Sequence, residues 1–257
     1  MKPLTNAGDE TAHINLALAD LAPGEALELG ADGETAAVVL SGVVDASTSD
    51  GASLGRAGGR TSVFEAPGDT VYAPAGTGLR LEATADGPAQ LAITSAAAEP
   101  SADAPPARII GPEDQRIAEV GEGNWSRTVR TILGPEHTAQ RLLLGETINP
   151  PGNWSSYPPH RHDRHNPPEE VDLEEVYLFR TNPAGGFGVQ LRYELDGERA
   201  EDTFVVRDDD IAVIRSGFHP VVAASGYELY YLWVMAGEGR VMMPYLDPAH
   251  AWVQAGR

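Results

Sequence analysis

Three histidines and a pair of glutamates have the types and the spacing of a metal site. His160 and His162 are one residue apart, so on a β-strand both imidazoles project from the same face. Glu174 and Glu175 begin a strand-like run farther along the chain, and His219 stands in a glycine-containing turn after another apolar run. Three imidazoles and one carboxylate suit one divalent ion, with Zn²⁺ the first choice and Mn²⁺ or Fe²⁺ as alternatives, and leave coordination positions open for water or substrate.

A chance pair of surface histidines is the simpler explanation of this motif. The chain has seven histidines in all, and three of them fall at strand-compatible positions together with a carboxylate, so the metal interpretation is favoured. Strand alternation puts Glu174 and Glu175 on opposite faces. Only one of the two carboxylates can therefore reach the ion that His160 and His162 address.

Short strands separated by turns fill the first part of the chain. Apolar runs alternate with Gly, Pro and Asp at the spacing of an all-β sandwich or barrel. We expect strands within residues 13–21, 26–30, 36–46, 62–66, 70–76, 79–85 and 90–96. Residues 97–106 are rich in Ala, Pro and acidic residues and have no apolar periodicity, which is typical of a linker. Two β-barrel domains are therefore expected, 1–98 and 107–257.

The second domain carries the candidate site on further strand-like runs. Residues 125–133 and 142–148 alternate polar and apolar side chains. Residues 230–235 are continuously apolar, as expected for a strand covered on both faces. Arg127 and Arg130 lie on opposite faces by parity, so at most one of them can face the barrel interior.

The ligand order, HxH, then Glu, then a distant His after a glycine turn, resembles the cupin superfamily. The runs GETINPPGNWSSYPPHRHD, LEEVY, GFGVQLRY, GFHPV and YYLWVMAG are more specific. Through them the chain resembles the 5-deoxy-glucuronate isomerases of bacterial myo-inositol catabolism, from about Asn124 to the C-terminus and more faintly before it. The resemblance implies an all-β bicupin fold of two antiparallel jelly-roll β-barrels. It also implies a metal held by His160, His162, Glu175 and His219, with Glu175 chosen because the family's liganding Glu precedes x-Tyr.

The chain departs from the common cupin pattern in three places. Twelve residues separate His162 from Glu175, which is more than common cupins have. Arg215 and Ser216 replace the usual proline-containing approach to the last histidine. In the N-terminal half, GDTVYAPAGTGL matches the second cupin signature with Leu79 at the histidine position. A cupin barrel without a metal is therefore expected there.

The resemblance implies an aldose–ketose isomerase that converts 5-deoxy-D-glucuronate to 5-dehydro-2-deoxy-D-gluconate without a redox cofactor. Such an enzyme moves a proton between adjacent carbons through an enediolate. A divalent ion that chelates the carbonyl and the neighbouring hydroxyl stabilises that charge and holds its geometry.

Candidates for the remaining roles come from the same region. Tyr177 and Gln190 are the candidates for proton transfer, and a structural role in a buried hydrogen-bond network is an equal alternative for both. A guanidinium meets a carboxylate in a bidentate fork. The candidates for binding the substrate carboxylate are Arg127, Arg180 and Arg192.

Composition excludes several other chemistries. The 257 residues contain no Cys and a single Lys, Lys2, so thiolate ligands, cysteine nucleophiles and Schiff bases are not expected. The formal net charge of −20 repels nucleic acid and anionic membrane surfaces, so neither is an expected partner. The sequence has no membrane-length apolar run and no leader-like start. We expect a cytoplasmic protein that acts on a small sugar acid, with a homo-oligomer left open.

Three other functions remain open from the sequence. A related isomerase that acts on an unsaturated uronate from pectin breakdown would share every site feature named above. A metal-dependent cupin dioxygenase with Fe²⁺ uses a compatible ligand set. A sugar-acid binding module with a closed, structural metal site is the non-enzymatic alternative.

Overall fold

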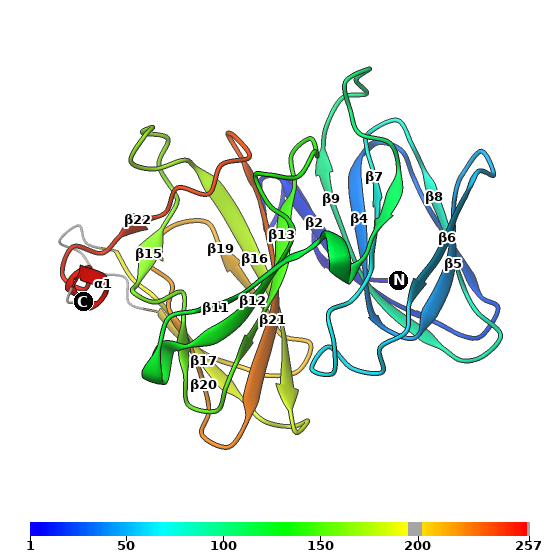
Figure 1. Ribbon diagram of the computed structural model, residues 1–257. Coiled ribbons are helices and arrows are strands. Elements are labelled where there is room, and N and C mark those ends of the chain that lie inside the picture. The colour runs from blue at the N-terminus through cyan, green and yellow to red at the C-terminus, as the bar shows by residue number, and fades with distance from the viewer. Residues whose placement is uncertain (195–201, 256–257) are drawn as a thin grey trace. The chain divides into compact units, whose positions relative to one another are not determined.

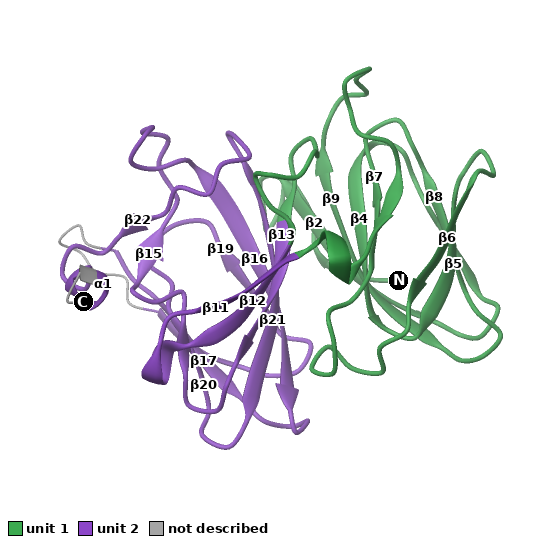
Figure 2. Cartoon of the chain, viewed as in Figure 1, with its two compact units in different colours: residues 1–115, 132–143 green, residues 116–131, 144–257 purple. Residues whose placement is uncertain are grey.

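The chain folds almost entirely into β-structure. The computed structural model describes residues 1–194 and 202–255, and their elements are shown in chain order in Figure 1. Two compact units divide the chain, one of residues 1–115 and 132–143 and the other of residues 116–131 and 144–257 (Figure 2). The all-β prediction is confirmed. The boundary expected from the sequence, 1–98 against 107–257, stays a prediction about which segments fold independently.

Unit 1 contains two antiparallel sheets. Their strand orders are β1-β2-β9-β4-β7-β10 and β3-β8-β5-β6. The strands are β1 Lys2–Thr5, β2 Ile14–Leu21, β3 Ala26–Leu29, β4 Gly33–Ser41, β5 Val43–Thr48, β6 Ser53–Gly58, β7 Thr70–Ala73, β8 Leu79–Ala83, β9 Ala89–Ala97 and β10 Arg108–Ile110. Apolar side chains from both sheets form the core, and Leu79 is fully buried within it.

The described residues of unit 2 form three sheets. Their orders are β11-β12-β13-β21-β16-β19, β14-β20-β17-β18 and β15-β22. The strands are β11 Arg116–Val120, β12 Arg127–Leu133, β13 Leu143–Asn149, β14 Trp154–Ser155, β15 His160–Arg161, β16 Leu173–Asn182, β17 Gly188–Arg192, β18 Asp202–Val206, β19 Ile211–Ile214, β20 Val221–Ala223, β21 Glu228–Gly237 and β22 Tyr245–Leu246. The last two residues of β12, the first residue of β13 and the segment between these strands, residues 132–143 in all, belong to unit 1.

Helical structure is short wherever the chain is described. The helical segments are η1 Pro112–Asp114, η2 Gly123–Trp125 and α1 Trp252–Ala255. In residues 1–194 and 202–255, no helix has the length and apolar character needed to cross a membrane.

Two segments of unit 1 differ from the expected strands. The run 36–46 is divided at Gly42, whose φ of 82° is a left-handed value that glycine adopts without strain. Residues 62–66 form a turn, so the expectation of a strand there is wrong. The backbone N–H and the hydroxyl of Thr61 both donate to the Glu65 carboxylate at 2.8 Å, and this local bonding competes with a strand ladder.

The pairing of β16 with β21 determines which side chains share a face. Glu175 lies opposite Met235, and Tyr177 lies opposite Trp233. Side chains alternate along each strand, so all four residues project from the same face of the six-stranded sheet. That face carries the candidate site described below.

A buried carboxylate fixes the segment between β12 and β13 inside unit 1. Glu34 is fully buried and accepts hydrogen bonds from the backbone N–H groups of Gln140, Arg141 and Leu142 at 2.5, 2.6 and 2.7 Å. The Tyr72 hydroxyl donates to the same carboxylate at 2.7 Å. A buried charge is tolerated because it is fully bonded in this way.

Glu34→Ala should therefore destabilise the protein strongly. The change leaves three backbone N–H donors and a tyrosine hydroxyl without their acceptor, and we expect a loss of about 3 kcal/mol or more in the free energy of unfolding. Urea denaturation followed by circular dichroism measures it. Glu28→Ala removes an exposed carboxylate that pairs with Arg80 and serves as the control, because exposed pairs contribute little. Equal losses in the two variants would contradict the assignment.

Candidate functional site

Three histidines from two segments of unit 2 converge in a cluster. His160 is in β15, His162 follows that strand, and His219 lies between β19 and β20. Their ligand nitrogens lie within 4.8 Å of one another. The ring centroids of His160 and His162 are 4.9 and 5.0 Å from that of His219. This cluster could hold a metal ion.

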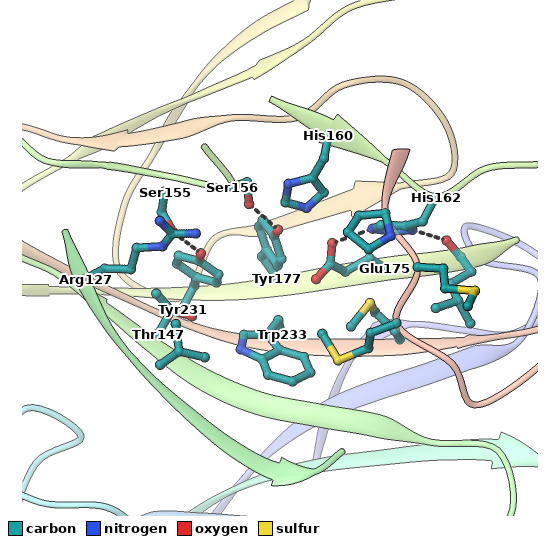
Figure 3. A pocket seen from close by; sticks show the side chains of 16 residues that line it. Arg127, Thr147, Ser155, Ser156, His160, His162, Glu175, Tyr177, Tyr231 and Trp233 are labelled. Atoms are coloured by element: carbon teal, nitrogen blue, oxygen red, sulfur yellow. Dashed lines mark hydrogen bonds and ion pairs between the residues drawn. The ribbon is translucent and has the colours of Figure 1, made fainter. Parts of the chain in front are cut away.

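Glu175 brings a carboxylate to the histidines. Its Oε2 lies 3.2 Å from His162 Nε2 and 3.3 Å from His219 Nε2, and Figure 3 shows Glu175 beside His162. Glu174 is also buried, but it does not line the cavity that His160, His162 and Glu175 line. Because side chains alternate along the strand, Glu175 reaches the cluster and Glu174 does not.

Backbone carbonyls determine which nitrogen of two rings faces the cluster. His162 Nδ1 is 2.6 Å from the carbonyl oxygen of Leu173, and His219 Nδ1 is 2.9 Å from that of Gly217. A carbonyl oxygen only accepts, so each Nδ1 donates and each neutral ring presents a lone pair at Nε2. His219 Nε2 is buried and has no hydrogen-bond partner in the described residues.

The donor set fits a divalent ion. Two imidazole lone pairs that converge on an anionic oxygen require a cation among them, and a ligating histidine usually donates its other N–H to a carbonyl or a carboxylate. His162 and His219 both make that outer bond to a carbonyl. The orphaned Nε2 of His219 is the observation that tests the fit, because a metal ion would supply its missing partner.

Charge in the cluster is strongly coupled. Burial opposes ionisation of Glu175, but His162 and His219 outweigh it and lower the pKa of this carboxyl to about 2. Desolvation also disfavours a charged His162, yet its bond to Glu175 raises its pKa. Desolvation, with His219 and His162 as neighbours, holds the pKa of His160 well below its ordinary value. The carboxylate therefore stays ionised, which favours a cation beside it.

A cavity of about 140 Å³ opens next to the cluster. In Figure 3, His160, His162 and Glu175 lie at one end, and Arg127 lies at the other. The other polar residues of the lining are Thr147, Ser155, Ser156, Tyr177 and Tyr231. The apolar lining consists of Val129, Leu173, Trp233, Met235, Met242, Met243 and Pro244.

Of the three arginines expected to bind the substrate carboxylate, Arg127 lines this cavity. Its Nη1 donates to the carbonyl oxygens of Trp125 and Tyr157 at 3.1 and 3.4 Å. Its Nε is buried without a hydrogen-bond partner in the part of the chain that the structure describes, and burial lowers the pKa of its guanidinium. Arg130, on the opposite face as parity requires, pairs with Glu146 at 3.2 Å.

The two other arginines expected to bind the substrate lie elsewhere. Arg180 pairs with Asp209, and Arg192 pairs with Asp202. Neither arginine lines the cavity beside the histidines. Acids of the chain itself engage both guanidinium groups, and the structure does not bring either arginine to the cluster.

The two candidates for proton transfer are separated. Tyr177 lines the cavity, and its hydroxyl is 2.9 Å from Ser156 Oγ. Burial and the neighbouring Glu175 hold the pKa of Tyr177 well above its ordinary value. Gln190 is buried outside the cavity lining, and its Nε2 donates to the carbonyl oxygen of His219 at 2.7 Å. Gln190 therefore contacts the backbone behind a histidine.

Sequence patterns missed most of the cavity wall. Ser155 and Tyr231 line it and are hydrogen-bonded to each other. The run YYLWVM contains the signal that could have found part of this wall, because Tyr231, Trp233 and Met235 alternate onto one face. Residues 242–243 come from a segment without strand periodicity, and nothing in the sequence places them at the site.

Comparison with known proteins identifies the family. The sequence model of the KduI/IolB family matches residues 2–253. The chain belongs to the KduI/IolB family. The 5-deoxy-glucuronate isomerase of Geobacillus kaustophilus is 42% identical over 199 residues, which cover 77% of this chain and 70% of the relative. The 5-deoxy-glucuronate isomerase of Bacillus subtilis strain 168 is 35% identical over 254 residues, which cover 97% of this chain and 91% of the relative.

Solved structures agree with the family and the fold. A crystal structure of an IolB-like protein from Salmonella typhimurium LT2 matches with a TM-score of 0.91 at 30% identity, covering 98% of this chain and 94% of that one. Lactobacillus farciminis oxalate decarboxylase matches with a TM-score of 0.66 at 14% identity, covering 95% and 82%. The second likeness shows the fold alone. The resemblance to the isomerase family is confirmed, and both solved structures agree with the all-β fold.

The position of Glu175 predicts its effect on metal affinity. Glu175→Gln removes the anionic oxygen between His162 and His219 and should lower the affinity for Zn²⁺ or Mn²⁺ on the order of 10-fold or more. Calorimetric titration of the chelator-treated protein measures this change. Glu174→Gln alters the adjacent buried carboxylate on the other face and is the matched control. A larger loss of affinity in Glu174→Gln would contradict this assignment, because it would mean that the other face of β16 meets the cluster.

Proposed function

We propose that this protein is an aldose–ketose isomerase that converts 5-deoxy-D-glucuronate to 5-dehydro-2-deoxy-D-gluconate. The observation that carries the proposal is a single cavity with the histidine–glutamate cluster at one end and the Arg127 guanidinium at the other. Family relatives named as 5-deoxy-glucuronate isomerases, 35–42% identical, support the same reaction. A sugar acid carries the two groups that these ends would bind, a carbonyl with its neighbouring hydroxyl and a carboxylate.

The cluster is proposed to hold one divalent ion through His160, His162, Glu175 and His219. When bound, Zn²⁺, or Mn²⁺ or Fe²⁺ in its place, supplies Lewis-acid stabilisation of negative charge on adjacent oxygens. The carbonyl bonds of His162 and His219 orient both rings for that role. Gln190 is proposed as a positioning residue, since its amide fixes the backbone of His219.

Arg127 is proposed to bind the substrate carboxylate. Among the described residues no carboxylate is paired with it, and its guanidinium faces the cavity. A bidentate pair with a carboxylate would satisfy the buried Nε and replace the hydration that burial removes. With the carboxylate at this end, the carbonyl end of the substrate extends to the histidines, where the proton must move.

Tyr177 is proposed to hold a proton next to the reacting carbons. Its raised pKa keeps the phenol neutral, so its hydroxyl can donate to a substrate oxygen and accept from Ser156. Tyr177 lines the cavity on the same strand and face as Glu175, which places this hydroxyl beside the cluster end. The two serines and the tyrosines then form the polar side of the cavity.

An NMR assay of the purified, metal-loaded protein tests the reaction. 5-Deoxy-glucuronate and the unsaturated-uronate product of pectin breakdown, in its keto form, are supplied side by side while dissolved oxygen is monitored. We expect conversion of the 5-deoxy acid without oxygen consumption. Conversion of the pectin-derived acid alone would assign the related isomerase activity, and oxygen uptake would assign a dioxygenase.

Arg127→Gln should weaken turnover through substrate binding. Losing two charge-assisted hydrogen bonds to a carboxylate is expected to lower kcat/KM on the order of 10²-fold, mainly by raising KM. Arg180→Gln and Arg192→Gln, measured alongside, test the two other arginines and should change kcat/KM far less. If either of them causes the larger rise in KM, the carboxylate binds at a different place.

A further inference from the structure

A buried arginine separates the two histidines of the HxH pair. Arg161 ends β15, directly after His160 and directly before His162, so alternation along the chain turns its side chain away from the two imidazoles. That side chain is only 8% exposed, and it does not line the cavity beside the cluster. A guanidinium is buried to this extent only when its charge is compensated. The partners that compensate it lie in the segments that carry the histidines.

Two buried carboxylates follow His162 and pair with this guanidinium. Arg161 Nε lies 3.3 Å from Glu170 Oε2 and 3.5 Å from Asp163 Oδ1. Glu170 Oε1 also accepts the backbone N–H groups of Asp163 and Arg164 at 2.8 and 3.1 Å. The Arg164 side chain, which is half exposed, reaches Asp163 only at 3.9 Å. Arg161 is thus the buried cation that holds the chain where it leaves His162.

The turn that carries His219 is linked to the same guanidinium by two routes. Arg161 Cζ lies over the ring of Phe218, the residue before His219, at 5.5 Å from its centroid. The second route runs through Asp163, whose Oδ2 accepts from the Gly217 N–H at 2.6 Å. The carbonyl oxygen of Gly217 in turn accepts from His219 Nδ1 at 2.9 Å. Arg161 therefore connects the HxH pair to the third histidine.

A second aromatic ring, from β22, contacts the guanidinium. Tyr245 lies opposite Arg161 in the β15–β22 ladder, and its ring centroid is 4.8 Å from Arg161 Cζ. Cation–π contacts are strongest where water is excluded. A planar guanidinium contacts rings with its faces while its N–H groups meet carboxylates, and a lysine ammonium does not combine these contacts. The surroundings therefore suit arginine better than any other cation.

We infer that Arg161 is a positioning residue that sets the place of His219 relative to His160 and His162. This inference rests on the proposed function, because these histidines are proposed ligands of a divalent ion. Without the guanidinium, the carboxylates of Asp163 and Glu170 would lose the buried cation between them and repel each other. The turn before His219 would lose its ring contact as well. Removing a group that orients metal ligands typically lowers affinity 10- to 100-fold.

Arg161→Gln and Arg161→Lys test this role through metal affinity. Calorimetric titration of the chelator-treated proteins with Zn²⁺ and Mn²⁺ is made where circular dichroism shows each protein to be folded. Arg161→Gln removes the charge and most of the N–H groups, so affinity should fall about 10²-fold. Arg161→Lys keeps a cation near both carboxylates, so the fall should be about 10-fold. The absorption spectrum of the Co²⁺-loaded variants should also change, because it depends on the arrangement of the ligands.

Arg60→Gln is the control that separates positioning from a general loss of stability. Arg60 is a buried arginine of unit 1, 5% exposed. Its Nε and Nη1 donate to the carbonyl oxygens of Val39 and Ala66, both at 3.0 Å. Losing these bonds should lower the free energy of unfolding. The affinity of the folded protein for Zn²⁺ and Mn²⁺ should stay at the wild-type value.

The outcomes separate this inference from the proposed function. Wild-type affinity in both Arg161 variants, or an equal fall in Arg60→Gln, overturns the positioning role while the metal site stands. A wild type that binds neither ion overturns the proposed metal site and this inference with it. A wild type that binds metal without isomerising the 5-deoxy acid counts against the proposed reaction alone, and the affinities then still decide the role of Arg161.

Discussion

The contact on which the rest of the site depends is that of the Glu175 carboxylate with the Nε2 atoms of His162 and His219. The Nε2 lone pairs of the two histidines point at the negatively charged carboxylate oxygen. These groups repel one another at such distances unless a proton or a metal ion lies among them. Backbone carbonyls hold both rings in this orientation from behind. The fold thus brings these donors together and orients them, as a metal site requires.

The long segment between the histidine pair and Glu175 does not disturb this contact. The Leu173 N–H donates to the His162 carbonyl oxygen at 2.8 Å, and His162 Nδ1 donates back to the Leu173 carbonyl oxygen. Residues 163–172 therefore form a loop whose flanking residues, His162 and Leu173, are hydrogen-bonded to each other. Asp163 connects that loop to the turn that precedes His219, because its carboxylate accepts from the Gly217 N–H at 2.6 Å. These bonds keep the histidines and Glu175 together, although more residues separate His162 from Glu175 than in common cupins.

Charge is distributed unevenly between the surface and the cavity. The chain has a formal charge of −20, a field that repels an anionic sugar acid at long range. Arg127 is the proposed local counter to this field, because it lines the cavity and no acid of the described residues is paired with it. The other cationic groups near the site are already paired, as Arg161 is with Glu170 and Asp163. Under the proposed function, a substrate carboxylate is therefore expected to bind at Arg127.

The sequence by itself determined the features that depend on a few neighbouring residues. Period-two alternation assigned the all-β class, put Arg127 and Arg130 on opposite faces and separated Glu174 from Glu175. Only the tertiary structure decided which arginine lacks an acid. Arg180 is paired with Asp209, 29 residues farther along the chain, and Arg192 is paired with Asp202 on the neighbouring strand β18. Cavity walls likewise combine strands far apart in the chain, and local periodicity carries no information about such long-range pairings.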